Sequence, residues 1–136
     1  MMDELSVDAK LENIEGVQDF IKARLGDCPQ KIQNQIGIVI DEVFSNIVRY
    51  AYDRSAGSVA VRMAVDDDIT IEFEDSGIAF NPLAHDDPDI SLPAEERELG
   101  GLGIFMVKKI MDSVEYRREG NKNILTIRKN DYQVVS

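Results

Sequence analysis

The chain is poor in several residue types that carry chemistry. Its 136 residues include no tryptophan, one cysteine, one histidine and four prolines. Cys28 has no partner for a disulfide within the chain, and His85 stands alone in an acidic segment. The sequence therefore predicts neither a zinc cluster nor a Ser–His or Cys–His catalytic arrangement.

Long hydrophobic runs are also missing. The apolar stretches are far shorter than the roughly 20 residues that a membrane-spanning helix needs. No basic segment leads into an apolar one, as it would in a cleaved signal peptide. We therefore expect a cytoplasmic protein that does not associate with membranes.

Basic residues are scarce relative to acidic ones. The 15 Lys and Arg residues against 26 Asp and Glu residues give a formal net charge of −11. Nucleic-acid binding relies on Lys and Arg that neutralise phosphates, so we expect no nucleic-acid partner. A protein this acidic would bind a triphosphate through Mg²⁺ and backbone N–H groups more than through a basic cluster.

The chain does contain enough apolar material for one core. Its apolar fraction is 43%, and its length is that of a single domain, expected to span residues 1–136. Apolar residues at helical spacing predict a helix from Leu11 to Leu25 and a second from about Pro29 to Tyr52. The apolar stripes are Leu11, Ile14, Val17, Phe20, Ile21 and Leu25 in the first helix, and Ile32, Ile36, Ile40, Val43 and Ile47 in the second.

Period-two alternation predicts two hairpins and an edge strand over residues 3–9. The hairpin strands are Ser58–Val65 with Ile69–Glu74, and Ser113–Arg118 with Asn123–Arg128; a helix over Ile104–Met111 precedes the second hairpin. This order predicts an α+β fold, a two-layer sandwich of about three helices on a mostly antiparallel mixed sheet.

Residues 81–99 (NPLAHDDPDISLPAEEREL) interrupt these patterns. They contain three of the four prolines and six acidic residues. A loop this long within a compact domain is usually functional or disordered, and we predict a lid over a ligand site.

Three short signatures follow one another along the chain: Glu42-x-x-x-Asn46, Asp75-x-Gly77 and Gly100-Gly101-x-Gly103. The first places a carboxylate and an amide one helical turn apart, at the border of the apolar stripe. The amide oxygen can ligate Mg²⁺, and the carboxylate can orient or deprotonate an attacking hydroxyl. In isolation, the favoured interpretation of the pair is two ordinary polar residues on a helix.

The other two signatures suit the same kind of ligand. Asp75 ends a strand, where it can accept a hydrogen bond from an adenine amino group, and Gly77 lets a flat ring approach the backbone. Gly101 and Gly103 lead into a helix whose free N–H groups and dipole favour phosphates. Each signature alone could be a turn or a helix start, but together they predict a nucleotide site.

In this order, the signatures resemble the motifs of the GHKL, or Bergerat-fold, ATPases. IVIDEVFSNIVRYAY resembles the N box, EDSGIAFNP the G1 box, and ELGGLGIFMVKKIMDSVEYRREGNKNILTI the G2 box with its closing hairpin. The chain is most similar to the anti-sigma-factor serine/threonine kinases, which contain a histidine-kinase-like ATPase domain. One departure is that the N box ends Tyr50-Ala51-Tyr52 here, where His-Ala-Tyr is usual.

The resemblance implies Mg²⁺ and ATP as cofactors, and a role for each matched residue. Asn46 would bind Mg²⁺, and Glu42 would be the general base. Asp75 would bind the adenine amino group, with Gly77 under the ring, and Thr126 would join the adenine water network. Gly101 and Gly103 would contact the phosphates. It further implies a serine-bearing STAS-domain antagonist as phosphoacceptor, a sigma factor as a further partner, and a homodimer.

Two functions from different classes fit these features. The first is a serine/threonine protein kinase that switches partners, for which Glu42 is the main support. The second is an ATP-regulated binding module with little or no kinase activity, in which nucleotide orders residues 81–99. The catalytic part of a histidine kinase is disfavoured, because the chain has no helix with a phosphoacceptor histidine.

Overall fold

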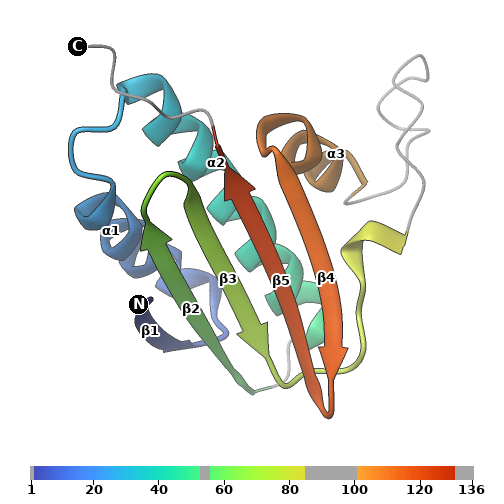
Figure 1. Ribbon diagram of the computed structural model, residues 1–136. Helices are drawn as coiled ribbons and strands as arrows, with labels where there is room; N and C mark the ends of the chain where they lie inside the picture. The colour runs from blue at the N-terminus through green and yellow to red at the C-terminus, as the bar shows by residue number, and fades with distance from the viewer. Residues whose placement is uncertain (1, 53–55, 85–100, 131–136) are drawn as a thin grey trace.

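A five-stranded antiparallel sheet forms one layer of the molecule (Figure 1). The computed structural model describes residues 2–52, 56–84 and 101–130. The strands are β1 (Asp3–Asp8), β2 (Ser58–Val65), β3 (Ile69–Asp75), β4 (Ser113–Glu119) and β5 (Lys122–Lys129), in the spatial order β1-β2-β3-β5-β4. All four pairings of these strands are antiparallel. The sheet is therefore antiparallel throughout these strands, whereas the sequence predicted a mostly antiparallel mixed sheet.

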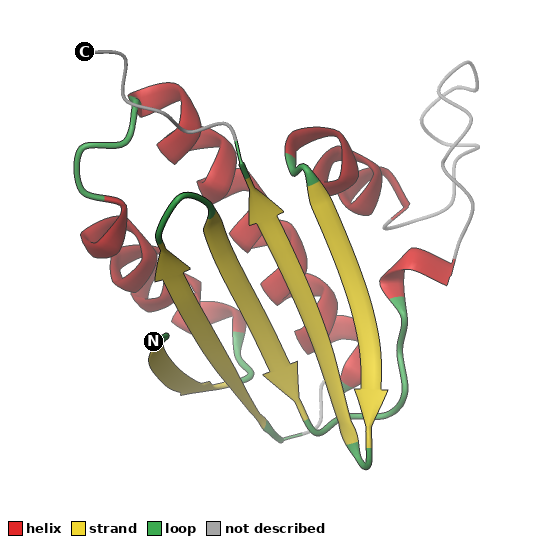
Figure 2. Cartoon of the chain, in the orientation of Figure 1, coloured by secondary structure: helices red, strands yellow, loops and turns green. Residues whose placement is uncertain are grey.

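In the described part of the chain, three α-helices lie on one face of this sheet, and none of them covers the other face (Figures 1 and 2). They are α1 (Ile14–Leu25), α2 (Gln30–Asn46) and α3 (Gly101–Ile110). The helix α2 lies between the other two and contacts both. The predicted α+β class and two-layer arrangement are therefore confirmed. No helix in the described part of the chain is long and apolar enough to cross a membrane.

The apolar faces of the two layers form a single core. The buried residues come from α1 (Val17, Ile21, Leu25), α2 (Ile32, Ile36, Ile40, Val43, Phe44) and the inner face of the sheet (Val59, Val61, Met63, Ile69, Ile71, Phe73, Leu125, Ile127). Burying each such side chain contributes about 1.5–3 kcal/mol relative to leaving it exposed. The periodic patterns of the sequence therefore place the core correctly.

Two helix starts differ from the prediction. Residues Leu11–Asn13 form a 3-10 turn before α1, and Leu11 is 48% exposed, so it does not belong to the buried stripe. The helix α3 begins at Gly101, three residues earlier than predicted, and ends at Ile110. Glycine has a low intrinsic helix propensity, which is why the sequence pattern alone assigns Gly101 and Gly103 to the preceding loop.

The C-terminal end of α2 widens into a π-helical turn over Ile47–Ala51. Such turns often occur at functional sites. The next residue, Tyr52, is buried, and its hydroxyl donates a hydrogen bond of 2.6 Å to the carbonyl of Ser58. The same hydroxyl accepts a hydrogen bond of 2.8 Å from the N–H of Ser76. Tyr52 therefore ties the end of this helix to the start of β2 and to the residue after β3.

We expect Tyr52→Phe to lower the free energy of unfolding by about 1–3 kcal/mol, because two partly buried backbone groups lose their partner. Urea denaturation measures this loss. Tyr50→Phe is the matched control, since it keeps the ring that stacks on Phe80. Equal stabilities of the two variants would contradict the bridging role of the Tyr52 hydroxyl.

Candidate functional site

Two buried polar residues face each other at one end of the sheet. The antiparallel register of β3 and β5 pairs Asp75 with Asn123, and each is only 4% exposed. The Nδ2 of Asn123 donates a hydrogen bond of 2.9 Å to Oδ1 of Asp75. The same Asp75 oxygen accepts a hydrogen bond of 2.9 Å from the N–H of Gly77. A carboxylate at the end of a central strand is thus held from two sides.

These residues line a mostly apolar cavity between the sheet and the helices. Its apolar lining consists of Val43, Ile47, Phe73, Phe80, Pro82, Ile104 and Leu125, and its polar lining consists of Asn46, Asp75 and Asn123. Ligand sites typically combine an apolar lining with a few converging polar groups. The cavity therefore unites Asn46 and Asp75 from the first two sequence signatures with Ile104, which directly follows the third.

Burial dominates the electrostatics of Asp75. Desolvation raises the pKa of this carboxyl above its ordinary value of 3.8. The hydrogen bonds from Asn123 and Gly77 and the charge of Arg118 act in the opposite direction, while the charge of Glu74 adds to the rise. Raised carboxyl pKa values in a cavity are typical of functional sites.

Asn46 lies at the C-terminal end of α2 and is 5% exposed. Among the described residues, the side-chain amide of Asn46 has no hydrogen-bond partner. Asn46 directly precedes the π-helical turn, and its side chain does not cap that turn. A buried amide oxygen in a cavity that also contains a carboxylate suits a hard cation such as Mg²⁺. Asn46 therefore fits the predicted role of metal ligand.

Glu42 lies one turn before Asn46 and points toward the start of α3. A Cβ atom placed on Gly103 would overlap the Glu42 carboxylate, so this glycine allows the two helices to approach. Gly103 belongs to the first turn of α3, where backbone N–H groups lack partners within the helix. A carboxylate there interacts favourably with the helix dipole. The structure thus brings the first and third signatures together.

Gly77 packs within the protein against the end of the π-helical turn. A Cβ atom at this position would overlap the carbonyl group of Ala51, at the end of the π-helical turn. The adjacent Ile78 donates its N–H to that same carbonyl over 2.8 Å. The absence of a side chain at Gly77 therefore lets the loop after β3 pack on the helix end, whatever further contact it makes with a ligand.

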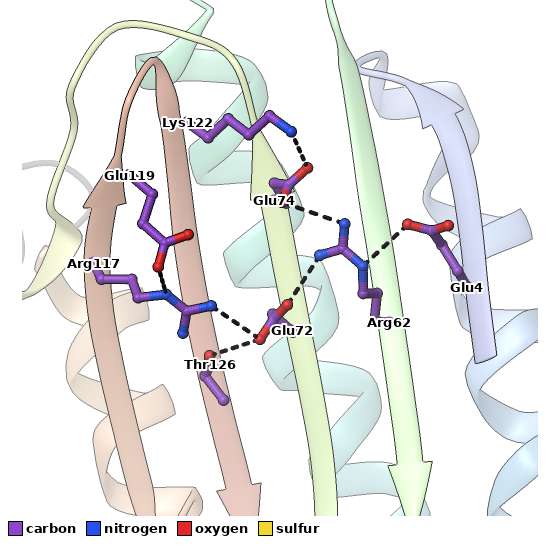
Figure 3. A network of polar contacts seen from close by, with 8 residues as sticks. All are labelled: Glu4, Arg62, Glu72, Glu74, Arg117, Glu119, Lys122 and Thr126. Carbon is purple, nitrogen blue, oxygen red and sulfur yellow. Dashed lines mark hydrogen bonds and ion pairs between the residues drawn. The ribbon is translucent and has the colours of Figure 1, made fainter. Parts of the chain in front are cut away.

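Thr126 is not among the residues that line the cavity, so the structure does not support its predicted place in the adenine water network. Side chains alternate across a strand, and Thr126 lies one residue after the cavity-lining Leu125. It pairs with Glu72, and its Oγ1 lies 3.4 Å from a carboxylate oxygen of Glu72 (Figure 3). Asn123, three residues earlier on the same strand, contacts Asp75 instead.

The face that holds Thr126 carries a network of ion pairs (Figure 3). The side chain of Arg62 lies 2.9–3.3 Å from carboxylates of Glu4, Glu72 and Glu74, which come from two neighbouring strands. Arg117 extends the network from β4. Ion pairs near the surface each contribute about 0–1 kcal/mol, so this partly exposed network has a modest effect on stability.

An aromatic pair borders the cavity. Tyr50 of the π-helical turn stacks on Phe80, with ring centroids 5.1 Å apart and an angle of 21° between the planes. Phe80 lines the cavity and precedes the 3-10 turn Pro82–Ala84. The tyrosine that replaces the usual histidine of the N box thus supports the segment that leads toward the predicted lid. Residues 85–99 of that lid, together with Gly100, lie outside the described residues.

We expect the stability of the protein to depend on pH through Asp75. A raised pKa in the folded state stabilises the fold fully below the ordinary carboxyl pKa, and this contribution is lost as pH rises through the folded-state value. Asp75→Asn cannot ionise and should escape this loss. The free energy of unfolding of the variant, relative to the native protein, should therefore rise with pH.

Urea denaturation at pH values from about 4 to 8 spans the relevant carboxyl range and measures this difference. Hydrogen bonds lost in Asp75→Asn add only an offset that does not vary with pH. A difference that is constant, or that falls as pH rises, would show that burial does not raise the pKa of Asp75.

Comparison with known proteins agrees with this geometry. Residues 7–129 match the family model of the histidine kinase-like ATPase domain. The chain is 27% identical over 130 residues to the serine-protein kinase RsbW of Bacillus cereus strain Q1, covering 90% of this chain and 81% of that relative. RsbW of Bacillus cereus strain AH187 is 30% identical over 93 residues, which cover 65% of this chain and 58% of that protein. The family-model match over most of the chain shows that it belongs to the histidine kinase-like ATPase domain family.

Proposed function

We propose that the protein is a Mg-ATP-dependent serine/threonine protein kinase. The observation that carries the proposal is that Asn46 and Asp75 line one cavity together with Ile104 of α3, while Glu42, one turn before Asn46, lies against Gly103 in the first turn of α3. The name of the relatives, serine-protein kinase, supports the same activity. A carboxylate beside a helix N-terminus that would hold phosphates is what a phosphotransferase needs beyond nucleotide binding.

Different residues of the site would bind different parts of the nucleotide. Asp75 accepts a hydrogen bond from the adenine amino group, and the first turn of α3, with Gly101 and Gly103, donates N–H groups to the phosphates. Asn46 would ligate Mg²⁺, which neutralises phosphate charge when bound. The acidic chain, with a net charge of −11, supports this reliance on backbone and metal over basic side chains.

Glu42 acts as the general base. Its carboxylate takes the proton of a serine hydroxyl as that oxygen bonds to the γ-phosphorus, and the bond between this phosphorus and the β,γ-bridging oxygen breaks to release ADP. The contact of Glu42 with Gly103 supports this role, because it holds the carboxylate beside the proposed phosphate site.

Nucleotide entry requires the lining of the cavity to open. The cavity has a volume of about 20 Å³, enough for one water molecule and too small for a purine ring. Phe80 and Pro82 form its wall on the side of the lid segment, residues 81–99. We propose that this wall moves when nucleotide binds, and that the lid then covers the site.

The acceptor and partners follow from the resemblance to anti-sigma-factor kinases. We propose a serine-bearing STAS-domain antagonist as the phosphoacceptor, a sigma factor as a further partner, a homodimeric assembly and a cytoplasmic location. The distinct alternative, an ATP-regulated binding module without efficient transfer, uses the same cavity and differs only in the role of Glu42.

We expect Asn46→Ala to remove most of the Mg²⁺ dependence of ATP binding. Isothermal titration in Mg²⁺ and in EDTA measures the ratio of the two affinities, which should approach one in the variant. Asn34→Ala is the matched control, because Asn34 is exposed on the same helix. An undiminished ratio in Asn46→Ala would exclude this residue as the metal ligand.

We expect Glu42→Gln to retain ATP binding and to lower the rate of phosphoryl transfer by about 10²–10⁴-fold. Transfer of radiolabelled phosphate to a STAS-domain protein measures the rate. Asp41→Asn, which neutralises the neighbouring exposed carboxylate, should transfer normally.

Gly103→Ala separates position from chemistry in the same assay. The added methyl group would push the Glu42 side chain aside while leaving its charge intact, so transfer should fall and ATP binding should fall less. Undiminished phosphoryl transfer by the Glu42→Gln variant would exclude Glu42 as the general base. An unmodified protein that binds ATP without transfer to any tested antagonist would favour the binding module.

A further inference from the structure

Asn123 connects three segments at the wall of the cavity. It is buried in β5, paired with Asp75 of β3 on one side and with Arg118 of β4 on the other. Its Nδ2 donates to Asp75 Oδ1 over 2.9 Å and to the carbonyl of Ile78 over 2.7 Å. Both amide protons are therefore used within the protein.

The carbonyl oxygen of the same side chain also accepts hydrogen bonds from within the protein. Asn123 Oδ1 accepts from the hydroxyl of Tyr116, from a guanidinium nitrogen of Arg118 at 3.1 Å and from the N–H of Phe80 at 3.2 Å. A flipped amide would set its N–H groups against these three donors and its oxygen against two acceptors. The network therefore determines one orientation of the side chain, with the N–H groups toward Asp75.

This orientation determines what Asp75 offers to a ligand. Among the described residues, both hydrogen bonds to the Asp75 carboxylate, from Asn123 and Gly77, end on Oδ1. The second oxygen, Oδ2, is then the one that remains for a molecule in the cavity. An ionised carboxylate oxygen accepts hydrogen bonds only, so it pairs with an amino group and repels a carbonyl oxygen.

We propose that Asn123 is a positioning residue that sets the base selectivity of the site, by holding Asp75 so that its Oδ2 reads a purine amino group and rejects a purine carbonyl. The proposal rests on the proposed nucleotide-binding function. It goes beyond that function, because Asn123 acts through Asp75 and has no free hydrogen-bonding group for the nucleotide itself.

The same contacts shape the wall of the cavity. Ile78 and Phe80 belong to the loop after β3, and both are bonded through their backbones to the Asn123 side chain. Phe80 in turn stacks on Tyr50 of the π-helical turn. One side chain thus sets both the carboxylate and the segment that must move when a base enters.

Several groups around Asp75 affect its ionisation, and the neutral hydrogen-bond donor Asn123 is one of them. Glu74 on the same strand disfavours the ionised carboxylate, and Arg118 on β4 favours it. On the helix side, Asn46 is the polar residue that lines the cavity with Asp75, and the hydroxyl of Tyr52 binds the neighbouring Ser76. Burial raises the pKa of Asp75, and the Asn123 hydrogen bond opposes that rise, so the bond helps to keep the carboxylate ionised.

The first experiment needs no nucleotide. Carbon-13 NMR titration of the Asp75 carboxyl in the full chain gives its titration midpoint in native protein, Asn123→Ala and Asn123→Asp. The midpoint should move to higher pH in Asn123→Ala and further in Asn123→Asp, whose similar shape replaces the donor with a second carboxyl. A midpoint unchanged in both variants would overturn the proposal, whatever their stability.

The second experiment measures selectivity. Isothermal titration of ATP and GTP, each with Mg²⁺, should show that Asn123→Ala binds ATP about tenfold more weakly, as expected for a lost hydrogen bond to a charged group. The preference for ATP over GTP should narrow at the same time. Asn121→Ala, an exposed asparagine in the same hairpin, is the control and should match the native protein.

The two experiments distinguish the two proposals. If the native protein binds neither nucleotide, the proposed function fails, and the carboxyl titration still reports whether Asn123 controls Asp75. If Asn123→Ala weakens ATP and GTP by the same factor, Asn123 is a structural residue and the selectivity proposal fails. A merely structural role would also leave the carboxyl midpoint of the folded variant in place.

Discussion

The pairing of β3 with β5 in a single register is the constraint on which the site depends. These strands are separated in sequence by the loop after β3, by α3 and by β4, yet they are neighbours in the sheet. Phe73 opposite Leu125 and Ile71 opposite Ile127 bury their side chains against the helices. A slip of one residue would turn these side chains out of the core. The apolar core therefore sets the register, and the register places Asn123 beside Asp75.

The helix α2 supplies the second half of the site. Its apolar side packs in the core, which determines its rotation about its own axis. Asn46 is consequently directed into the cavity and Glu42 toward α3. The π-helical turn that follows places the carbonyl of Ala51 where Ile78 can bind it. One helix thus carries the proposed base and metal ligand and also anchors the loop that follows Asp75.

The two faces of the sheet carry different kinds of polar groups. The open face carries partly exposed ion pairs around Arg62, each of which contributes little to stability. The inner face contains a few buried polar groups in an apolar cavity, where a hydrogen bond is stronger and an unpaired group more costly. This difference explains why Asp75, and not the carboxylates of Glu72 or Glu74, is suited to recognise a ligand.

Local periodicity predicts the α+β class, the positions of the strands and the buried stripe of α2, and the fold confirms all three. Short motifs identify Glu42, Asn46 and Asp75 as candidate site residues, because each motif lies within a few neighbouring residues. The outward orientation of Thr126 and the contact of Asn123 with Asp75 are evident only in the folded chain. The start of α3 at Gly101 is likewise evident only there. Which residues meet across two strands depends on a register set by packing between distant segments, and periodicity along the chain carries no information about that register.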